Sequence, residues 1–383
     1  MKYSLHKIPQ NLPYIQGTEI KNILSVLATR QLSGNGAYTK LCEEHIEQDL
    51  SIRKTLLTHS GTAALEMMAI LAKIKPGDEI IMPSFTFSST ANAFVLRGAV
   101  PVFVDIRPDT LNLDENLIEE AITEKTRAVV PVHYAGVACE MDSICKIAHK
   151  HKLFVLEDAA QGYLSTYKDK YLGSIGDMSA FSFHETKNII SGEGGAININ
   201  NPAFDTRSEI VWEKGTNRTQ FYRGKVDKYT WVDVGSSYLP AEIIAAFLES
   251  QLRSAKQITS KRTTLWNAYH KSFMPYAASG LLQLPFVPDY CCHNAHIYYM
   301  ILPSPQARDR LIKHLGSLGI LSVFHYIPLH SAPAGKQFGR IGSTMDVTDR
   351  IHCRLVRLPL YTDMSKSDLS MVIKSIHAFF RNV

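Results

Sequence analysis

Short apolar runs and stretches with helical spacing alternate along the first half of the chain. The runs lie at 55–58, 79–82, 102–105, 128–132, 154–157, 180–183 and 196–199. Most of them are separated by stretches in which apolar residues recur with helical spacing, at 62–71, 90–97, 116–122 and 141–151. Strands that are apolar almost throughout, joined by helices, are typical of a mainly parallel sheet covered on both faces. The pattern therefore predicts an α/β domain.

The pattern changes after Tyr238. A long helical stretch is expected at 240–273, with Pro240 where a helix can start. A strand at 296–302, a helix at 307–318, a strand at 321–325 and a last helix at 366–380 are expected to follow. We predict two domains: residues 1–240, which begin with an irregular arm ending in the glycine-rich turn at 31–36, and a smaller α+β domain at 241–383.

Composition narrows the class of protein. Of the 383 residues, 45% are hydrophobic and 20% charged, as in soluble globular proteins. The chain has no uncharged apolar run near the roughly 20 residues that a membrane span needs. The first ten residues are too polar for a signal peptide. We therefore expect a cytoplasmic protein.

Metal and nucleic-acid binding are not predicted. The six cysteines have no C-x-x-C spacing, and the 15 histidines form no H-E-x-x-H motif. No long Lys/Arg run is interleaved with aromatics. Five basic residues between Lys214 and Lys228 do face a single acid, Asp227. This segment is either a solvated face or a loop that receives an anionic substrate such as a diphosphate.

One lysine stands between two apolar runs. Lys187 lies in S-F-H-E-T-K-N at 182–188, and G-E-G-G follows at 192–195. If the fold carries this lysine inward, desolvation lowers its pKa, and the neutral amine can form a Schiff base with a carbonyl. An exposed lysine on a glycine-rich turn is the alternative. The glycines do not indicate a dinucleotide-binding loop, because they lack G-x-G-x-x-G spacing and precede a strand.

Three further features lie at expected strand ends. Asp158 ends a buried run, at the edge where open α/β sheets bind ligands, and it either caps a helix or pairs with a protonated ring nitrogen. Gly61 and Thr62 open a helix after a strand, which makes either an anion site or an ordinary N-cap. Phe87 either stacks on a planar ring or belongs to the core.

The aspartate at a strand end, followed by the lysine in S-F-H-x-x-K-N and then G-E-G-G, closely resembles the DegT-type sugar-nucleotide aminotransferases. The resemblance covers essentially the whole chain. It implies the pyridoxal phosphate (PLP) transferase fold of type I, as in aspartate aminotransferase, and at least a homodimer. The stretches 131–142, 213–218, 226–231 and 324–330 resemble one branch of the family. In that branch L-glutamate aminates dTDP-4-keto-6-deoxyglucose to dTDP-4-amino-4,6-dideoxygalactose, for enterobacterial common antigen or O-antigen.

The resemblance also implies site residues. Lys187 would hold PLP covalently and move protons, while the cofactor passes through its pyridoxamine phosphate form. The other expected cofactor contacts are Asp158 at the ring nitrogen, Gln161 near the ring oxygen, Phe87 on the ring, and Gly61, Thr62, Ala63 and Ser182 at the phosphate. Many relatives read G-Y-N-Y where this chain reads Gly235-Ser236-Ser237-Tyr238, so Ser237 would replace an asparagine that reaches the phosphate across the dimer interface.

Substrate contacts are expected from basic and imidazole side chains. We expect Arg218 and Arg223, with Lys228, to bind the diphosphate, and His133, His325 and His330 to line the sugar pocket, with at least one of these histidines structural. Alternatives are an aminotransferase for another nucleotide keto sugar and a non-catalytic PLP-fold sensor. Ketosugar dehydration is disfavoured, because dehydrating relatives carry histidine in place of Lys187.

Overall fold

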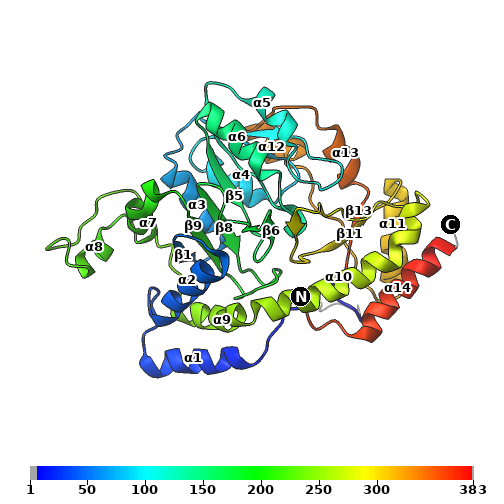
Figure 1. The fold of residues 1–383 in the computed structure, drawn as a ribbon, viewed down its shortest axis with the longest axis horizontal. Helices are drawn as coiled ribbons and strands as arrows, with labels where there is room; N and C mark the ends of the chain where they lie inside the picture. Colours follow the sequence, from blue (N-terminus) through cyan, green and yellow to red (C-terminus); the bar gives the residue numbers. More distant parts are fainter. Residues whose placement is uncertain (1–6, 382–383) are drawn as a thin grey trace.

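A large sheet with helices on both faces forms the centre of the protein (Figure 1). The computed structural model describes residues 7–381. The strand order is β1-β9-β8-β5-β4-β2-β3-β12, and neighbours run parallel except that β9 is antiparallel to both β1 and β8. The predicted runs form β1 (Thr55–Thr58), β2 (Glu79–Pro83), β3 (Val100–Val104), β4 (Thr126–Val129), β5 (Phe154–Asp158), β8 (Met178–Ser182) and β9 (Gly195–Ile199). The α/β prediction is confirmed.

The remaining strands are short: β6 (Thr166–Tyr167), β7 (Lys170–Tyr171), β10 (Cys291–Cys292), β11 (Tyr298–Ile301), β12 (Arg340–Ile341) and β13 (Leu355–Leu358). The helices are α1 (Thr18–Thr29), α2 (Ala37–Leu50), α3 (Gly61–Leu71), α4 (Ser88–Val95), α5 (Ile118–Ala121), α6 (Met141–His151), α7 (Asp205–Trp212), α8 (Arg218–Tyr222), α9 (Glu242–Arg253), α10 (Ala255–Ala278), α11 (Pro305–Ser317), α12 (Pro333–Phe338), α13 (Asp346–His352) and α14 (Lys366–Arg381). None of the helices within 7–381 combines the length and the apolar character of a membrane span.

Strand β2 shows why the sheet is apolar at nearly every position. Ile80 and Met82 pack in one cluster with α3, α4 and α7, whereas Ile81 packs on the opposite face with α5 and α6. Near β1, that second face is covered by α2 and α9. Because side chains alternate along a strand, covering both faces requires apolar residues at successive positions.

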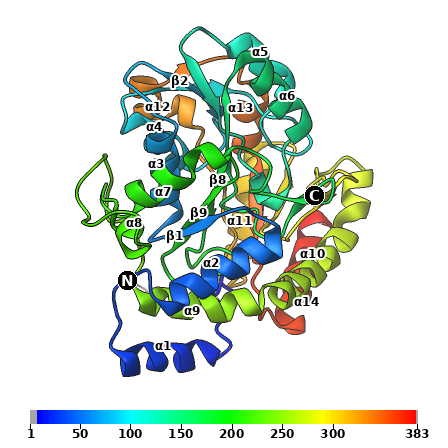
Figure 2. The ribbon, with the colours of Figure 1, turned by 60° about the vertical axis from the view of Figure 1, so that its left-hand side comes forward.

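The C-terminal part of the chain forms a second layer at the carboxyl edge of the sheet (Figure 2). Its own core joins α10, α11 and α14 to the antiparallel pair β11 and β13. A smaller cluster connects the two layers: Phe85 and Tyr134, which follow β2 and β4, pack with Tyr299 of β11 and Leu355 of β13. Loops at the carboxyl ends of the strands therefore lie between the layers.

The long helical stretch predicted at 240–273 forms, but as two helices and not as one. The chain forms α9 and α10, which are separated at Ser254. The Ser254 hydroxyl donates a 2.7 Å hydrogen bond to the side chain of Gln16. This contact with the N-terminal segment holds the break between the two helices in place.

The irregular N-terminal arm is also only partly correct, because α1 forms within it. Asn22 of α1 donates hydrogen bonds to Ala246 O and to Glu249 of α9, so the arm packs on its own chain. Residues 1–6, on which part of the signal-peptide expectation rests, lie outside the described residues.

The strand predicted at 321–325 is absent as an element. Only Val323 pairs with a neighbour, exchanging two backbone hydrogen bonds with Arg357 of β13, at 2.7 and 3.2 Å. The chain then turns at Tyr326, whose φ of 23° lies in a region that is strained for a non-glycine residue. The turn ends the pairing after one residue.

Candidate active site

Lys187 lies in the loop that joins β8 to the antiparallel strand β9. Backbone hydrogen bonds of 2.8 Å close this loop, from Phe183 N to Gly194 O and from Glu185 N to Gly192 O. The Lys187 side chain is partly buried. The loop therefore carries the lysine inward, and the exposed-turn alternative does not apply.

The amine of Lys187 is easier to deprotonate than an ordinary lysine. Burial lowers the pKa of Lys187 to about 8; the charge of Asp158 opposes this shift, and the charge of Arg357 adds to it. A substantial neutral fraction is thus present near neutral pH. Only the neutral amine is a nucleophile or a proton acceptor.

Asp158 ends β5 and is 5% exposed. One carboxylate oxygen accepts a 2.7 Å hydrogen bond from the Thr90 hydroxyl of α4, and the other accepts from Ala160 N at 3.2 Å. A turn, and no helix, follows this strand, so Asp158 does not cap a helix. The carboxylate of Asp158 lies close enough to Lys187 to raise the pKa of the lysine. Asp158 forms no salt bridge with any side chain of residues 7–381.

The preceding acid, Glu157, has a structural role. It is fully buried and accepts hydrogen bonds from His133 Nε2 at 2.9 Å and from Gly173, Ile175 and Gly176 N–H at 2.6 to 2.8 Å. Burial alone would raise the pKa of Glu157, but the bonds from His133 and the backbone lower it overall. Glu157 therefore ties the loop before β8 to the end of β4.

Replacing Glu157 with glutamine is expected to destabilise the fold by about 2–4 kcal/mol, because buried N–H donors would then face an amide NH₂. The measurement is the urea midpoint of the purified variant. Glu119→Gln is the matched control: Glu119 pairs with Lys150 and His151 at the surface, where ion pairs contribute little to stability. Equal midpoints for the two variants would contradict the structural role of Glu157.

The first turn of α3 forms a cup of N–H groups beside Ser182. Ser60 caps the helix and accepts from Ala63 N at 3.0 Å, so the N-cap alternative is observed and this N–H is occupied. An α-helix leaves its first N–H groups without internal partners, so those of Gly61 and Thr62 remain available for an anion. The cup can thus bind a phosphate through Gly61, Thr62 and Ser182 more readily than through Ala63.

Two glycines allow this cup to form. A Cβ on Gly61 would lie 2.8 Å from Ser182 Cβ, and one on Gly195 would lie 2.5 Å from the backbone of Ser60. Such distances are too short for any side chain. The glycine at the start of β9 therefore serves the close packing of α3 against the β8–β9 pair.

Aromatic side chains form one wall of the site. Tyr134 donates or accepts a 2.8 Å hydrogen bond with His325 Nδ1, and the His325 ring stacks on Tyr326 with a centroid distance of 3.7 Å. Phe85 packs edge-on against Tyr326. Phe87, by contrast, is 60% exposed at the start of α4, so it is not core and is free to cover a planar ligand.

Gln161 and Asn188 position the elements around Lys187. Gln161 accepts from Ala135 N at 2.7 Å and donates to the Tyr326 hydroxyl at 2.9 Å. Asn188, next to the lysine, donates to Asn294 O at 2.7 Å, and its Oδ1 accepts from His296 Nδ1 at 3.1 Å. The Asn188–His296 contact could not be predicted from sequence, because His296 lies on a distant segment of the chain.

The three candidate histidines have different surroundings. His133 is fully buried and engages Glu157 and Cys139 N, which argues against a sugar contact. His330 contacts Ser84 Oγ at 2.8 Å and a carboxylate of α13 at 3.2 Å. His325 faces the site, and burial lowers its pKa well below the usual range, with smaller effects from Arg357 and Lys187. Of the three, His325 is the one best placed to meet a substrate.

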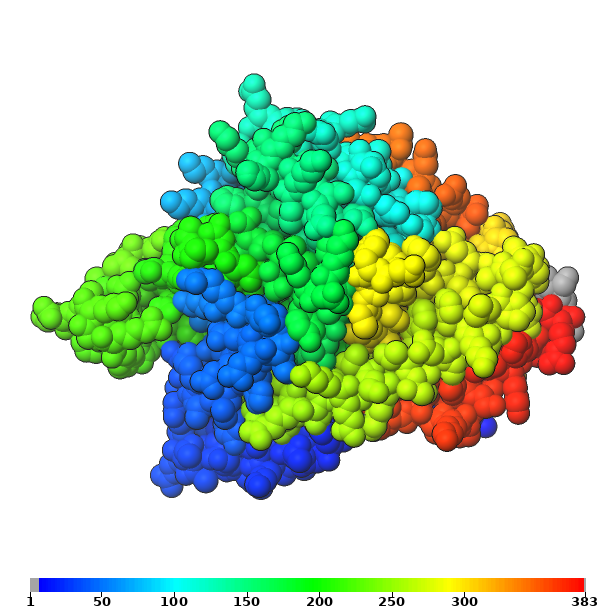
Figure 3. All heavy atoms as spheres, viewed as in Figure 1, coloured from blue at the N-terminus to red at the C-terminus, as the bar shows by residue number. Residues whose placement is uncertain are grey.

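The segment 213–237 projects from the body of the protein, and α8 lies near its tip (Figures 1 and 3). We call it the projecting segment. Its base is closed by a backbone bridge between Glu213 and Ser237. Large apolar side chains are exposed along it: Phe221, Tyr222, Tyr229, Trp231, Val232 and Val234. Ser237 is exposed as well.

The basic residues of the projecting segment are not equivalent. Arg223 forms a two-bond ion pair with Glu209 of α7, at 2.9 and 3.0 Å, so its guanidinium is already engaged. Arg218 stacks over the ring of Tyr222 and donates to its hydroxyl, and it stays exposed. Lys228 is also exposed. Arg218 and Lys228 are therefore better placed than Arg223 for a new anion.

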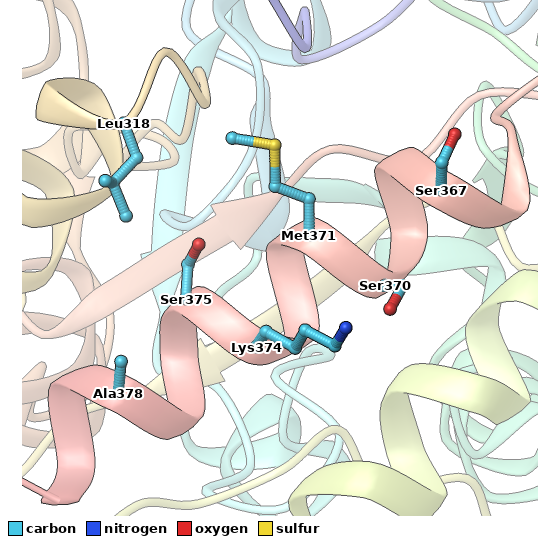
Figure 4. Close-up of a pocket in the computed structure, with 7 residues that line it drawn as sticks. All are labelled: Leu318, Ser367, Ser370, Met371, Lys374, Ser375 and Ala378. Atoms are coloured by element: carbon cyan, nitrogen blue, oxygen red, sulfur yellow. The ribbon is translucent and has the colours of Figure 1, made fainter.

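Two surface hollows lie away from this site. One, of about 460 Å³, lies on α14 and is lined by Leu318, Ser367, Ser370, Met371, Lys374, Ser375 and Ala378 (Figure 4). The other, of about 540 Å³, includes Val155, Asp177 and Asn200 at the amino ends of the parallel strands, the edge opposite Asp158. Within residues 7–381 no group of three His, Cys, Asp or Glu side chains could hold a metal ion.

The residues at the carboxyl edge fit PLP. They supply an amine with a pKa near 8, a carboxylate fixed by Thr90, and free N–H groups at a helix start. The model of the DegT/DnrJ/EryC1/StrS aminotransferase family matches residues 13–377. The chain belongs to this family. The family prediction made from the Lys187 motif is thus confirmed.

Relatives of the DegT/DnrJ/EryC1/StrS family match the chain over nearly its whole length. The spore coat polysaccharide biosynthesis protein SpsC of Bacillus subtilis is 35% identical over 380 residues, covering 97% of this chain and 96% of that protein. Among solved structures, the Streptococcus pneumoniae sugar aminotransferase Spr1654 in its PLP form has a TM-score of 0.89 at 27% identity, covering 98% and 99% of the two chains. Helicobacter pylori PseC, an aminotransferase of pseudoaminic acid biosynthesis, has a TM-score of 0.89 at 25% identity, covering 98% and 100%. The protein is therefore a PLP-dependent aminotransferase with the fold of these enzymes, as predicted.

Proposed function

We propose that the protein transfers the amino group of L-glutamate to a nucleotide-linked keto sugar for polysaccharide biosynthesis. The preferred reaction converts dTDP-4-keto-6-deoxy-D-glucose and L-glutamate to dTDP-4-amino-4,6-dideoxy-D-galactose and 2-oxoglutarate. The names of SpsC, Spr1654 and PseC support a sugar substrate. The observation that carries the proposal is the low-pKa Lys187 beside the fixed carboxylate of Asp158.

Each site residue has a definable task. PLP, when bound, supplies an aldehyde that exchanges amines and a ring that accepts electrons. Lys187 would hold the cofactor through Nζ, and its neutral Nζ would take a proton from the donor's α-carbon and later deliver one to the sugar carbon. The carboxylate of Asp158 would pair with a protonated ring nitrogen of the cofactor. Phe87 covers the ring face and excludes water.

The diphosphate of the substrate requires cations in addition to the charges next to Lys187. Arg218 and Lys228 lie on the projecting segment, which extends away from the body of its own chain. We propose that in a homodimer the segment reaches the site of the second copy, where these cations bind the diphosphate and Ser237 bonds the cofactor phosphate. Contact with the second copy would also cover the exposed aromatic side chains of the segment.

Mixing two inactive variants should therefore restore activity. One variant carries Lys187→Ala and the other Arg218→Ala with Lys228→Ala. In a randomly paired mixture half of the dimers are hybrids with one complete site, so about a quarter of the wild-type rate is expected. The measurement is the rate of the unfractionated dimers obtained by co-expression; hybrids purified through two different tags should reach about half of the wild-type rate. A rate no higher than that of the unmixed parents, or an active monomer in light scattering, would contradict this arrangement.

A substrate panel tests the reaction itself. Holoenzyme with L-glutamate is offered dTDP- and UDP-linked 4-keto and 3-keto sugars, and the products are separated by ion-exchange chromatography. We expect turnover of the dTDP-linked 4-keto sugar, with 2-oxoglutarate formed in equal amount. Turnover of a 3-keto sugar alone would transfer the proposal to a different nucleotide sugar, and no amination of any sugar would refute it.

A further inference from the structure

An acid and a lysine share the space at the carboxyl edge of the sheet without forming an ion pair. The charge of Asp158 raises the pKa of Lys187, so the two groups are near each other. Within residues 7–381, however, no salt bridge joins them. Opposite charges attract strongly where water is largely excluded, so a contact must hold the carboxylate away from the amine.

The hydroxyl of Thr90 provides this contact. Thr90 belongs to the first turn of α4 and is fully buried. It donates a 2.7 Å hydrogen bond to Oδ2 of Asp158, whereas Oδ1 accepts only a longer bond, of 3.2 Å, from Ala160 N. A hydrogen bond to a charged group is shorter and stronger than one between neutral groups. The rotation of the carboxylate is therefore fixed mainly from α4.

A second threonine supports the first. The hydroxyl of Thr86, which is 2% exposed, lies 2.8 Å from the hydroxyl of Thr90. Because Thr90 gives its single hydroxyl proton to Asp158, its oxygen accepts the proton of Thr86. Both O–H groups thus point toward the carboxylate, and each strengthens the other. The two threonines form a buried relay that ends on Asp158.

Helix geometry alone does not explain the direction of the Thr90 hydroxyl. In α10 the hydroxyls of Thr263, Thr264 and Ser272 donate to backbone carbonyls four residues earlier, at 2.9, 3.0 and 2.7 Å. This is the usual hydrogen bond of such a residue inside a helix. Thr90 instead donates out of its own helix to the end of β5. Its hydroxyl is thus committed to Asp158.

The charges around Lys187 show what a displaced carboxylate would change. Burial lowers the pKa of Lys187 to about 8, Asp158 opposes this shift, and Arg357 adds to it. His296 and His325 face the same space, and burial lowers the pKa of both, with a smaller effect from Lys187. Closure of the carboxylate onto the amine would favour the ammonium form and remove the neutral base.

We propose that Thr90, supported by Thr86, is a positioning residue that keeps the Asp158 carboxylate from closing onto the Lys187 amine. The proposal rests on the aminotransferase function given above. The separation leaves the lysine able to act as a base and leaves the carboxylate available to a cofactor ring nitrogen. Phe87, 60% exposed, lies between the two threonines, so one turn both covers the ring and fixes the acid.

The titration of Lys187 in the apoprotein tests this role directly. Thr90→Val keeps the shape of the side chain and removes the hydroxyl. We expect the midpoint for Lys187 to rise from about 8 toward the ordinary value of about 10.4, because the released carboxylate pairs with the ammonium. The measurement is the pH dependence of acetylation of Lys187 by acetic anhydride, followed by peptide mass spectrometry.

Two further variants sharpen the titration. Thr90→Ser restores the hydroxyl and should return the midpoint to about 8. Thr86→Val should raise the midpoint less than Thr90→Val, since Thr90 still bonds the carboxylate. The direction is also diagnostic, because loss of the charge in Asp158→Asn lowers the pKa of Lys187, whereas loss of the Thr90 hydroxyl raises it.

Thr55→Val is the matched control for a lost buried hydroxyl. Thr55 of β1 is 2% exposed and donates a 2.9 Å hydrogen bond to Asn198. It lies at the amino end of its strand, whereas Asp158 lies at the carboxyl end of β5. The control should lower the melting temperature, as the loss of a buried hydrogen bond does, and leave the midpoint for Lys187 unchanged.

Turnover of the holoenzyme provides a second readout. In Thr90→Val the turnover number at saturating substrates should fall roughly tenfold to a hundredfold, because the acid and the base are misplaced. The glutamate concentration at half-maximal rate should stay within about threefold of the wild type, because no contact with the donor is lost. Thr90→Ser should recover a turnover number within about threefold of the wild type.

Three results would overturn the assignment: a midpoint for Lys187 that stays or falls in Thr90→Val, an equal rise in Thr55→Val, or no recovery in Thr90→Ser. A lower melting temperature with an unchanged midpoint would make Thr90 a structural residue. The titration needs no substrate. If the holoenzyme aminates no sugar, the proposed function fails, and the midpoint still decides the role of Thr90.

Discussion

Changing Lys187 to alanine is expected to abolish covalent PLP attachment and to reduce transamination by at least about a thousandfold. The variant loses the amine that holds the aldehyde and the base that moves the proton, and a general base alone contributes about 10²–10⁴-fold. The measurements are the visible absorption of the PLP-loaded protein and the rate of 2-oxoglutarate formation. Full activity in Lys187→Ala would overturn the proposed function.

Lys187→Arg is the matched control, because arginine keeps the charge but stays protonated at all accessible pH values. It should be as inactive as the alanine variant. In the wild type, the rate at which apoprotein takes up PLP should rise as pH increases through about 8, since the pKa of Lys187 is lowered to about 8 and the neutral amine dominates above it. A midpoint near the ordinary lysine value of about 10.4 would show that the amine is not desolvated.

Asp158→Asn is expected to lower the turnover rate by roughly 10²–10³-fold while PLP remains attached to Lys187. Asparagine can still accept the hydrogen bond of the Thr90 hydroxyl, so the change removes charge and leaves the contact that fixes the side chain. Without the carboxylate, a cofactor ring nitrogen is no longer held protonated, and electron withdrawal from the substrate weakens. The turnover number and the absorption spectrum together measure the effect.

Asp158→Asn also tests whether the charge of Asp158 raises the pKa of Lys187. The charge of Asp158 raises the pKa of Lys187, so removing it should lower that pKa below about 8 in the apoprotein. Asp142→Asn, at an exposed acid that pairs with Lys168, is the control and should change neither value. Near-normal turnover in Asp158→Asn would mean that the carboxylate acts only as a structural acceptor.

The sheet was predictable because burial on both faces of a strand makes its adjacent residues apolar. Ile80, Ile81 and Met82 are all apolar since the strand is buried on both faces, and this is visible in any short window of sequence. Lys187 and Asp158 were found for a similar reason: each follows a buried strand. The division of the chain near residue 240 and the roles of the site residues remain predictions.

Features that depend on distant contacts were missed. The break at Ser254 depends on Gln16, which lies far away in the sequence. The hydrogen bond between His133 and Glu157 joins the ends of two strands. The sequence around each residue does not show that the other is its partner. Arg357 stands in an otherwise apolar strand, where its lack of a counter-charge can be recognised only after the neighbouring elements are in place.

Strand β12 is synthesised late, so the main sheet cannot be completed until most of the chain has left the ribosome. Arg340 and Ile341 complete the main sheet by pairing with Val102 and Phe103 of β3, and Arg340 also pairs with Glu79. A chain emerging from the ribosome leaves the β3 edge open until this late segment appears. Open edges recruit strands from other chains, so truncation before residue 340 should yield aggregating protein even though every other strand of the sheet is present.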